Sequence, residues 1–399
     1  MTVRNQARTP KHATAAAGFT LVELLIALAV IVLLASITLP SFKGMLKDQR
    51  VSQSARVVQS MAESARARAI ALGRPVALIF DRVPVDPTID PTFNHISDNT
   101  STRLSIGEVF PPYEGDWAGS TGVLLDVLPS GTPDGAPDTI SIELAKVASL
   151  WDMSTGTATG LVEAGDLIQL SDHSQTFSIS SITLTGTSPN FYVLIAFDNP
   201  PAGFGIAEPL WTTGSGDVRF RLIRRPSKTM AGSVAIPRGL CVDLSESGMG
   251  VSGTEFAVTA RPTTSFADRY GPLFVVFNAR GTVDGIYYRA HTSTSSVPSL
   301  ITFVASSPNG VLHFLVGRTD QVQPSGTTPI SDRDDYKPNL MDGTNIWISI
   351  NPFTGAIYST PNGTITPVTA TGLTAAEIAV MNRLQARVFA INMLNGRGS

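Results

Sequence analysis

Gly18-Phe19-Thr20-Leu21-Val22-Glu23-Leu24-Leu25 opens an apolar run over residues 19–39, whose polar members are Glu23, Ser36 and two threonines. At a rise of 1.5 Å per residue, a helix over this run is long enough to cross the roughly 30 Å hydrocarbon core of a bilayer. A carboxylate in such a span is costly to bury, so Glu23 is a candidate functional residue that needs a partner. The run therefore predicts a membrane-spanning helix.

A short polar leader, residues 1–18, precedes this run and carries Arg4, Arg8 and Lys11. A secretory signal has its small residues and its cleavage site after the apolar core. Here Ala15-Ala16-Ala17-Gly18 lies before the core. This order predicts a leader that is cut on the cytoplasmic side and an apolar helix that stays on the mature chain.

These residues resemble the N-terminal motif of type IV prepilins and of the pseudopilins of type II secretion systems. The resemblance is carried by Gly18, by Phe19, by Glu23 as the fifth residue after the cut, and by Pro40 at the end of the apolar run. It implies cleavage after Gly18 by a prepilin peptidase and N-methylation of Phe19. It also implies that Glu23 directs assembly with other pilins or pseudopilins.

Charge alone does not orient the helix in the membrane. Three basic residues precede the apolar run, and Lys43, Lys47 and Arg50 follow it closely, so the two flanks are balanced. The resemblance implies a leader in the cytoplasm, an anchor in the inner membrane over residues 19–39, and an exported, periplasmic remainder.

The helical pattern continues beyond Pro40 to Leu72, because small and apolar residues recur at a spacing of three or four. They are Val51, Ala55, Val58, Met61 or Ala62, Ala65, Ala69 and Leu72. Gly73 suits the end of a helix, and Pro75 prevents its continuation. We expect one helix over residues 19–72, bent near Pro40, whose second half packs an alanine-rich face on the next domain.

The stretch from Ser64 to Leu78, Ser-Ala-Arg-Ala-Arg-Ala-Ile-Ala-Leu-Gly-Arg-Pro-Val-Ala-Leu, resembles one branch of the pseudopilins. In this GspH/FimT branch, the helix passes through such a stretch into the first strand. The resemblance implies the same order of elements here.

Beyond the helix, the composition indicates a turn-rich β domain. Hydrophobic residues make up 43% of the chain and charged residues 15%, with 34 glycines and 27 prolines, so a core can form. β-Branched and aromatic residues predict strands at 74–80, 191–197, 218–223, 240–244, 273–277 and 346–350. Residues 81–137, rich in Pro, Asp, Gly and Ser, predict a long insertion. The predicted fold class is α+β, with an antiparallel β-rich domain over residues 73–399.

Two similar stretches, 274–283 and 346–357, each predict a hairpin in which an Asn begins a turn that contains Gly. A C-terminal helix is predicted by the capping-box pair Thr374 and Glu377 and by an apolar stripe at helical spacing. The stripe comprises Ile378, Met381, Leu384, Val388 and Ile391. We expect this stripe to face the sheet, with Arg383 and Arg387 on the other faces. A partner-binding helix is the alternative.

Catalytic and metal-binding patterns are scarce. Cys241 is the single cysteine, and the five histidines have no metal-ligand spacing. Gly248-Met-Gly250-Val-Ser-Gly253 precedes a strand-like pattern, which favours a Gly-rich turn over a dinucleotide site. A solvated turn is favoured over calcium binding for four aspartates near Asn345. They are Asp332, Asp334, Asp335 and Asp342. The sequence thus predicts no enzyme, no cofactor and no metal.

Nucleic-acid binding is not favoured by the bulk charge, because removal of the leader takes the net charge from −3 to −6. Candidate phosphate contacts are Arg219, Arg221, Arg224, Arg225 and Lys228. Arg219 and Arg221 share one face of a predicted strand. A charged solvent face of an edge strand explains them equally well.

The residues and the resemblance together predict a minor pilin or pseudopilin subunit that assembles through its N-terminal helix. The long insertion favours a place at a filament tip over one in the shaft. The alternative is a membrane-anchored adhesin, or a ligand- or DNA-binding protein, that uses the prepilin export route without joining a filament.

Overall fold

The computed structural model describes residues 20–83, 99–126, 138–170, 176–198, 218–229, 232–257, 271–294, 297–322, 337–366 and 373–394. The chain divides into two compact units, with the boundary between Gln49 and Arg50. Each unit is described by itself.

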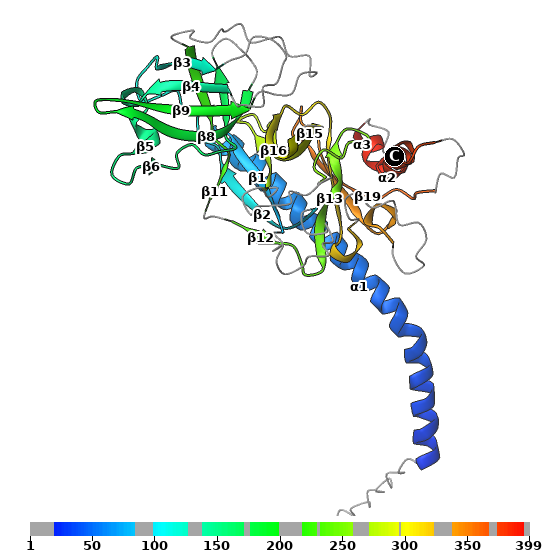
Figure 1. Cartoon of the computed structure of the whole chain (residues 1–399). Helices are drawn as coiled ribbons and strands as arrows, with labels where there is room; N and C mark the ends of the chain where they lie inside the picture. The colour runs from blue at the N-terminus through cyan, green and yellow to red at the C-terminus, as the bar shows by residue number, and fades with distance from the viewer. Residues whose placement is uncertain are drawn as a thin grey trace, which may run out of the picture. The chain divides into compact units, whose positions relative to one another are not determined.

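The first element is α1 (Leu21–Leu72), a helix of 52 residues drawn in blue in Figure 1. Gly73 follows it with a φ of 63°, and its N–H donates to the Ile70 carbonyl oxygen at 3.3 Å. The predicted single helix and its end at Gly73 are therefore confirmed. Pro40 lies inside the helical segment, and the bend there stays a prediction. Within the described residues, no helix is both long and apolar enough to cross a membrane.

The described part of the second unit is built on an 11-stranded sheet with the order β16-β15-β14-β1-β2-β13-β17-β18-β19, while β11 and β12 also pair with β2. Every pairing in it is antiparallel. The bounds are β1 (Val76–Arg82), β2 (Thr100–Glu108), β11 (Ser227–Lys228), β12 (Val234–Ala235), β13 (Leu240–Met249), β14 (Leu273–Phe277), β15 (Val283–Thr294), β16 (Val297–Ser306), β17 (Leu312–Arg318), β18 (Ile346–Ile350) and β19 (Ile357–Pro361).

The second half of α1 packs on one face of this sheet. Its inward residues are the small and apolar ones that the sequence pattern selects: Val51, Ala55, Val58, Met61, Ala62, Ala65 and Ala69. They share a core with Leu78, Phe80, Phe314 and Ile348 of the sheet. The predicted alanine-rich packing face is confirmed. Alanine lets the helix approach the strands closely.

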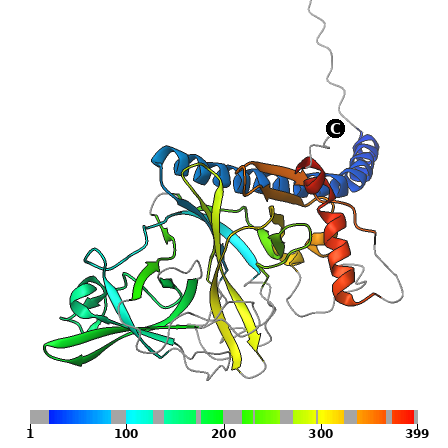
Figure 2. The same ribbon diagram turned by 90° about the horizontal axis from the view of Figure 1, so that it is seen from above.

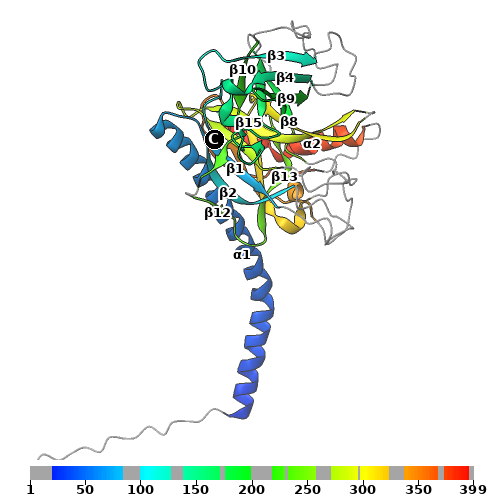
Figure 3. The ribbon, with the colours of Figure 1, turned by 60° about the vertical axis from the view of Figure 1, so that its left-hand side comes forward.

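Six further strands close into a barrel with the order β10-β3-β4-β9-β8-β7, shown in green and cyan in Figure 3. Their bounds are β3 (Thr121–Asp126), β4 (Asp138–Glu143), β7 (Leu167–Leu170), β8 (Thr176–Thr187), β9 (Asn190–Asp198) and β10 (Val218–Ile223). Apolar side chains, among them Leu124, Ile140, Ile195 and Phe220, fill the interior. Between β4 and β7 lie the short elements η1 (Leu144–Lys146), η2 (Ala148–Leu150), β5 (Trp151–Asp152) and β6 (Thr157–Ala158).

The predicted insertion at 81–137 contains β2 and β3, which belong to two different sheets. Residues 100–108 form β2, which pairs with β1 inside the main sheet. The barrel strands extend instead from Thr121 to Ile223. Turn-rich composition marks where the chain leaves regular structure, but it does not tell which sheet the next strand joins.

The other strand predictions are confirmed. Residues 191–197 and 240–244 lie within β9 and β13, and residues 218–223, 273–277 and 346–350 coincide with β10, β14 and β18. Arg219 and Arg221 lie on an exposed face of β10, as the alternative explanation expected, but β10 is not an edge strand, because it pairs with both β3 and β7.

The chain ends in two helices, α2 (Ala375–Ala386) and α3 (Val388–Leu394). Figure 2 shows them in red, on a different side of the unit from the barrel. Ala386 and Ala390 pack on Leu315 and Trp347. Neighbouring positions on the same strands, such as Phe314 and Ile348, face α1. Because side chains alternate along a strand, the C-terminal helices cover the sheet face opposite α1.

The predicted orientation of the C-terminal helices is wrong. Met381, Leu384 and Val388 are 40%, 47% and 39% exposed, whereas Arg387 is 0% exposed. Beneath the helices, carbonyl oxygens of Glu246 and of the turn at residues 250–253 accept hydrogen bonds from the guanidinium groups, and Ala386 and Ala390 pack beside them. The local chemistry of this face outweighs the apolar pattern of the helix.

Candidate functional site

The N-terminal candidate residues lie at the start of α1. Gly18 and Phe19 fall outside the described residues. Glu23 forms a capping box with Thr20, which the sequence analysis did not identify although the Thr-x-x-Glu pattern was present. The Glu23 N–H donates to Thr20 Oγ1 at 3.2 Å, and Glu23 Oε2 accepts from Thr20 N at 3.4 Å and from Thr20 Oγ1 at 3.3 Å.

This geometry places a carboxylate at the positive end of the helix dipole, where it is stabilised. The carboxylate belongs to the first turn of α1, close in sequence to the expected new amino terminus at Phe19. Glu23 thus caps its own helix, and its pairing with an ammonium group stays a prediction.

The first turns of α1 also present a large apolar surface. Large hydrophobic residues from Leu21 to Leu34 are all more than half exposed. Exposed apolar surface of this extent marks a segment that is covered by lipid or by other protein. Side chains of residues 37–47, which include Pro40, lie outside the description.

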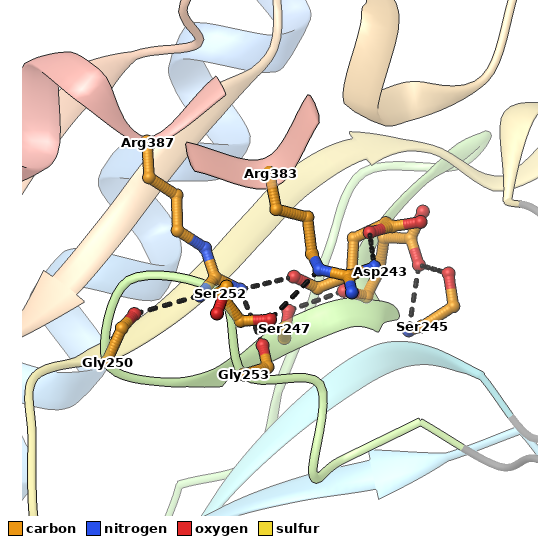
Figure 4. A network of polar contacts seen from close by, with 9 residues as sticks. Asp243, Ser245, Ser247, Gly250, Ser252, Gly253, Arg383 and Arg387 are labelled. Atoms are coloured by element: carbon orange, nitrogen blue, oxygen red, sulfur yellow. Dashed lines mark hydrogen bonds and ion pairs between the residues drawn. The ribbon is translucent and has the colours of Figure 1, made fainter. Parts of the chain in front are cut away.

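A second candidate is a buried polar cluster under the C-terminal helices, shown in Figure 4. The Arg387 guanidinium donates to three carbonyl oxygens, those of Glu246 at 2.7 Å, Gly250 at 2.9 Å and Gly253 at 2.9 Å. Its plane also lies over Trp347, at 4.9 Å from the ring centre. Arg383 Nε donates to the Ser252 carbonyl oxygen at 3.0 Å. Both arginines thus hold the Gly-rich turn that the sequence analysis predicted.

That turn is followed by further turn residues up to Ala257 rather than by the strand that its sequence suggested. Glu255 Oε2 accepts from the Met249 N–H at 2.8 Å, which folds the chain back on itself. The predicted turn at the Gly-x-Gly-x-x-Gly pattern is confirmed. The strand expected at residues 254–259 is wrong for residues 254–257, and the last two residues lie outside the described ranges.

Two carboxyl groups lie in the same cluster. Burial raises the pKa of Asp243 to about 6, although hydrogen bonds from Ser245 and Asn339 oppose the shift. Burial and the negative charge of Asp243 raise the pKa of Glu246 to about 7. Burial likewise lowers the pKa of Arg387 to about 10. In each case removal from water disfavours the charged form.

The hydroxyl and imidazole groups nearby have structural partners. Ser247 Oγ donates to the Asp243 carbonyl oxygen and accepts from the Leu315 N–H at 3.1 Å. His313 lies in β17, with Nδ1 at 2.8 Å from Ser349 Oγ. Burial lowers the pKa of His313 to about 3, so this imidazole is neutral. The arrangement joins the sheet, the turn and two helices.

The remaining sequence candidates are dispersed. Arg221 pairs with Glu114 at 2.6 Å, Arg225 with Asp166 at 2.9 Å, and Lys228 with Asp81 at 2.6 Å. Their charges are matched by acidic groups of the same chain. Asp332, Asp334 and Asp335 fall outside the described residues, and Asp342 accepts from Thr344 in its own turn. Across the described ranges, no group of His, Cys, Asp or Glu is arranged to hold a metal ion.

The N-terminal segment has a counterpart in a known family. Residues 14–39 match the family model of the prokaryotic N-terminal methylation motif. The predicted prepilin-type N-terminus is thereby confirmed, and the match supports a protein of the type IV pilin or pseudopilin kind that is processed by a prepilin peptidase. A search of curated proteins finds no match.

Proposed function

We propose that this chain is a minor structural subunit of a type IV pilus or a type II secretion pseudopilus, of the GspH/FimT branch. Support comes from one continuous helix with two different halves. Its start carries the methylation motif and an exposed apolar surface. Its second half is packed by alanines on a β-sheet. Such a helix joins an assembly segment to an outer domain.

In this proposal residues 19–39 anchor the subunit in the inner membrane before assembly, and the β-rich domain lies on the exported side. On assembly, the helix leaves the lipid and packs among the helices of sister subunits. Glu23 then neutralises the methylated amino terminus of a neighbour. A buried charge pair of this kind fixes register more than it adds stability.

The barrel bears on the position of the subunit in a filament. It adds a closed barrel to the sheet domain. In the shaft of a filament every copy of the subunit would have to accommodate this barrel beside its neighbours. A bulky subunit fits more easily at the tip, where one copy is present.

The barrel also supports a second candidate function, a membrane-anchored adhesin or ligand-binding protein. The loop before β3 presents Trp117, which is 70% exposed while its Nε1 donates to the Ala145 carbonyl oxygen at 3.0 Å. An aromatic ring that is fixed and exposed is a common feature of binding surfaces. Co-purification with sister pilins separates the two candidates, because only a filament subunit requires them.

Glu23→Ala tests the assembly role. The variant should still insert and still be cleaved, since removing a charge from an apolar span favours insertion. Incorporation should fall, because the partner's ammonium would be left buried and unpaired at a cost of about 3–5 kcal/mol. The measurement is crosslinking to sister pilins in membranes, at matched expression, with Glu63→Ala as a control outside the apolar half.

A tip position reduces the expected loss, since a terminal helix has fewer neighbours. Equal crosslinking of wild type and Glu23→Ala would contradict the assembly role of this carboxylate. The anchored adhesin would then be the better account.

A further inference from the structure

Two atoms of the buried cluster under the C-terminal helices, Glu246 Oε2 and Arg387 Nε, are without a hydrogen-bond partner. Arg387 donates to three carbonyl oxygens, and Arg383 Nε donates to a fourth. The nearest cationic nitrogen to Glu246 is Arg383 Nη1, at 3.6 Å from Oε2. This oxygen is buried and has no hydrogen-bond partner. The guanidinium groups are committed mainly to the main chain of the turn.

A buried carboxylate without a donor is costly, whereas a protonated carboxyl group brings its own donor. The surroundings of Glu246 point the same way. It faces Asp243 on its own strand β13 and Arg383 and Arg387 from the helices. Arg387 in turn faces neutral His313 on β17 and Glu255 in the turn beyond Gly253. The cluster thus contains three carboxyl groups and two guanidinium groups, and protonation of one carboxyl group balances the charge.

We propose that Glu246 binds a proton when α2 and α3 dock on the sheet, so that the docking of these helices is linked to pH. Protonation of Glu246 and docking of the helices are linked because the two arginines beside Glu246 also join the helices to the turn that follows β13. When the helices leave, Glu246 and the turn carbonyls are exposed to water, and the carboxyl group returns to ordinary acidity.

The direction of the effect follows from the raised pKa of Glu246. Its ordinary value is 4.5 and its value in the docked state is about 7. Docking is therefore strongest below pH 4.5, weakens as pH rises, and levels off above about 7. For one such group, the equilibrium constant for opening rises roughly tenfold per pH unit across that window.

Hydrogen exchange of the full-length protein in detergent micelles tests the proposal. After correction for the intrinsic pH dependence of exchange, the opening constant of amides in α2 and α3 should rise roughly 40-fold between pH 5 and pH 7. Amides of β1 in the same samples report whether the sheet stays intact. If the opening constant of amides in the wild-type helices does not change between pH 5 and pH 7, the proposal is overturned, whatever the variants do.

Glu246→Gln provides the second arm, because a glutamine has the shape of the protonated glutamate and does not titrate. In this variant the helices should stay docked and their opening should lose its pH dependence. Glu114→Gln, an exposed barrel carboxylate paired with Arg221, is the matched control and should retain the dependence. An unchanged dependence in Glu246→Gln would assign the effect to another group and overturn the proposal.

Discussion

Gly281 and Gly355 lie in the turns of two different hairpins, and the two turns touch. The Asn278 and Asn351 carbonyl oxygens each accept from the Gly N–H three or four residues later, at 2.8 Å in both turns. Arg66 of α1 donates to the carbonyl oxygens of Gly281 at 3.1 Å and of Thr354 at 3.3 Å. Single residues thus connect the helix to both hairpins.

Gly355→Ala should lower the free energy of unfolding by roughly 3 kcal/mol. Gly355 has a φ of 66°, which disfavours any side chain, and an added Cβ would overlap the Gly281 carbonyl oxygen. The measurement is urea unfolding followed by tryptophan fluorescence. Gly343→Ala is the control, because a Cβ there meets nothing within 4 Å, and its effect should be below about 0.5 kcal/mol. Similar losses in the two variants would contradict the role of the paired turns.

Sequence reasoning at the residue scale identified these turns but not the buried cluster. Asn and Gly have a local signature, because one supplies a hydrogen bond and the other a positive φ. Arg387 has none. Its acceptors at Glu246, Gly250 and Gly253 are more than a hundred residues away in sequence, and only the fold brings them together.

Helices differ in how far their own sequence determines where they end and which face packs on the sheet. The end of α1 is encoded by Gly73 and Pro75 and the alanine face by its spacing, so both were predictable. The apolar stripe of α2 and α3 predicted the helices but gave the opposite face. The spacing of apolar residues shows which side of a helix is apolar. It does not show which groups the sheet presents to that helix. The exposed stripe remains the feature that favours the partner-binding alternative.

The barrel shows the same limit for strands. Alternation and β-branched content predicted β9 and β10 as strands. Barrel closure depends on which strands pair, as in β10 with both β3 and β7. The sequence of one strand does not show which distant strand it pairs with. The composition of residues 81–137 therefore could not show that β2 and β3 belong to different sheets.

At the scale of the whole molecule, the boundary between the two compact units at Gln49 and Arg50 suggests where the chain can be shortened. A chain that begins at Lys47 should be folded and monomeric, because it loses the apolar run and keeps the helix half with the alanine face. Sedimentation and circular dichroism would show this. Aggregation that is relieved only by restoring residues 19–39 would contradict a self-sufficient domain.

The mature N-terminus tests the account most directly. Mass spectrometry of the protein purified from membranes should find N-methyl-Phe19 as its first residue, because the sequence predicts a cut after Gly18, within the motif matched at residues 14–39. Gly18→Val should leave an unprocessed precursor in the inner membrane, since the larger side chain blocks the peptidase. A mature chain that begins elsewhere, for example near Ser36, would contradict the prepilin account.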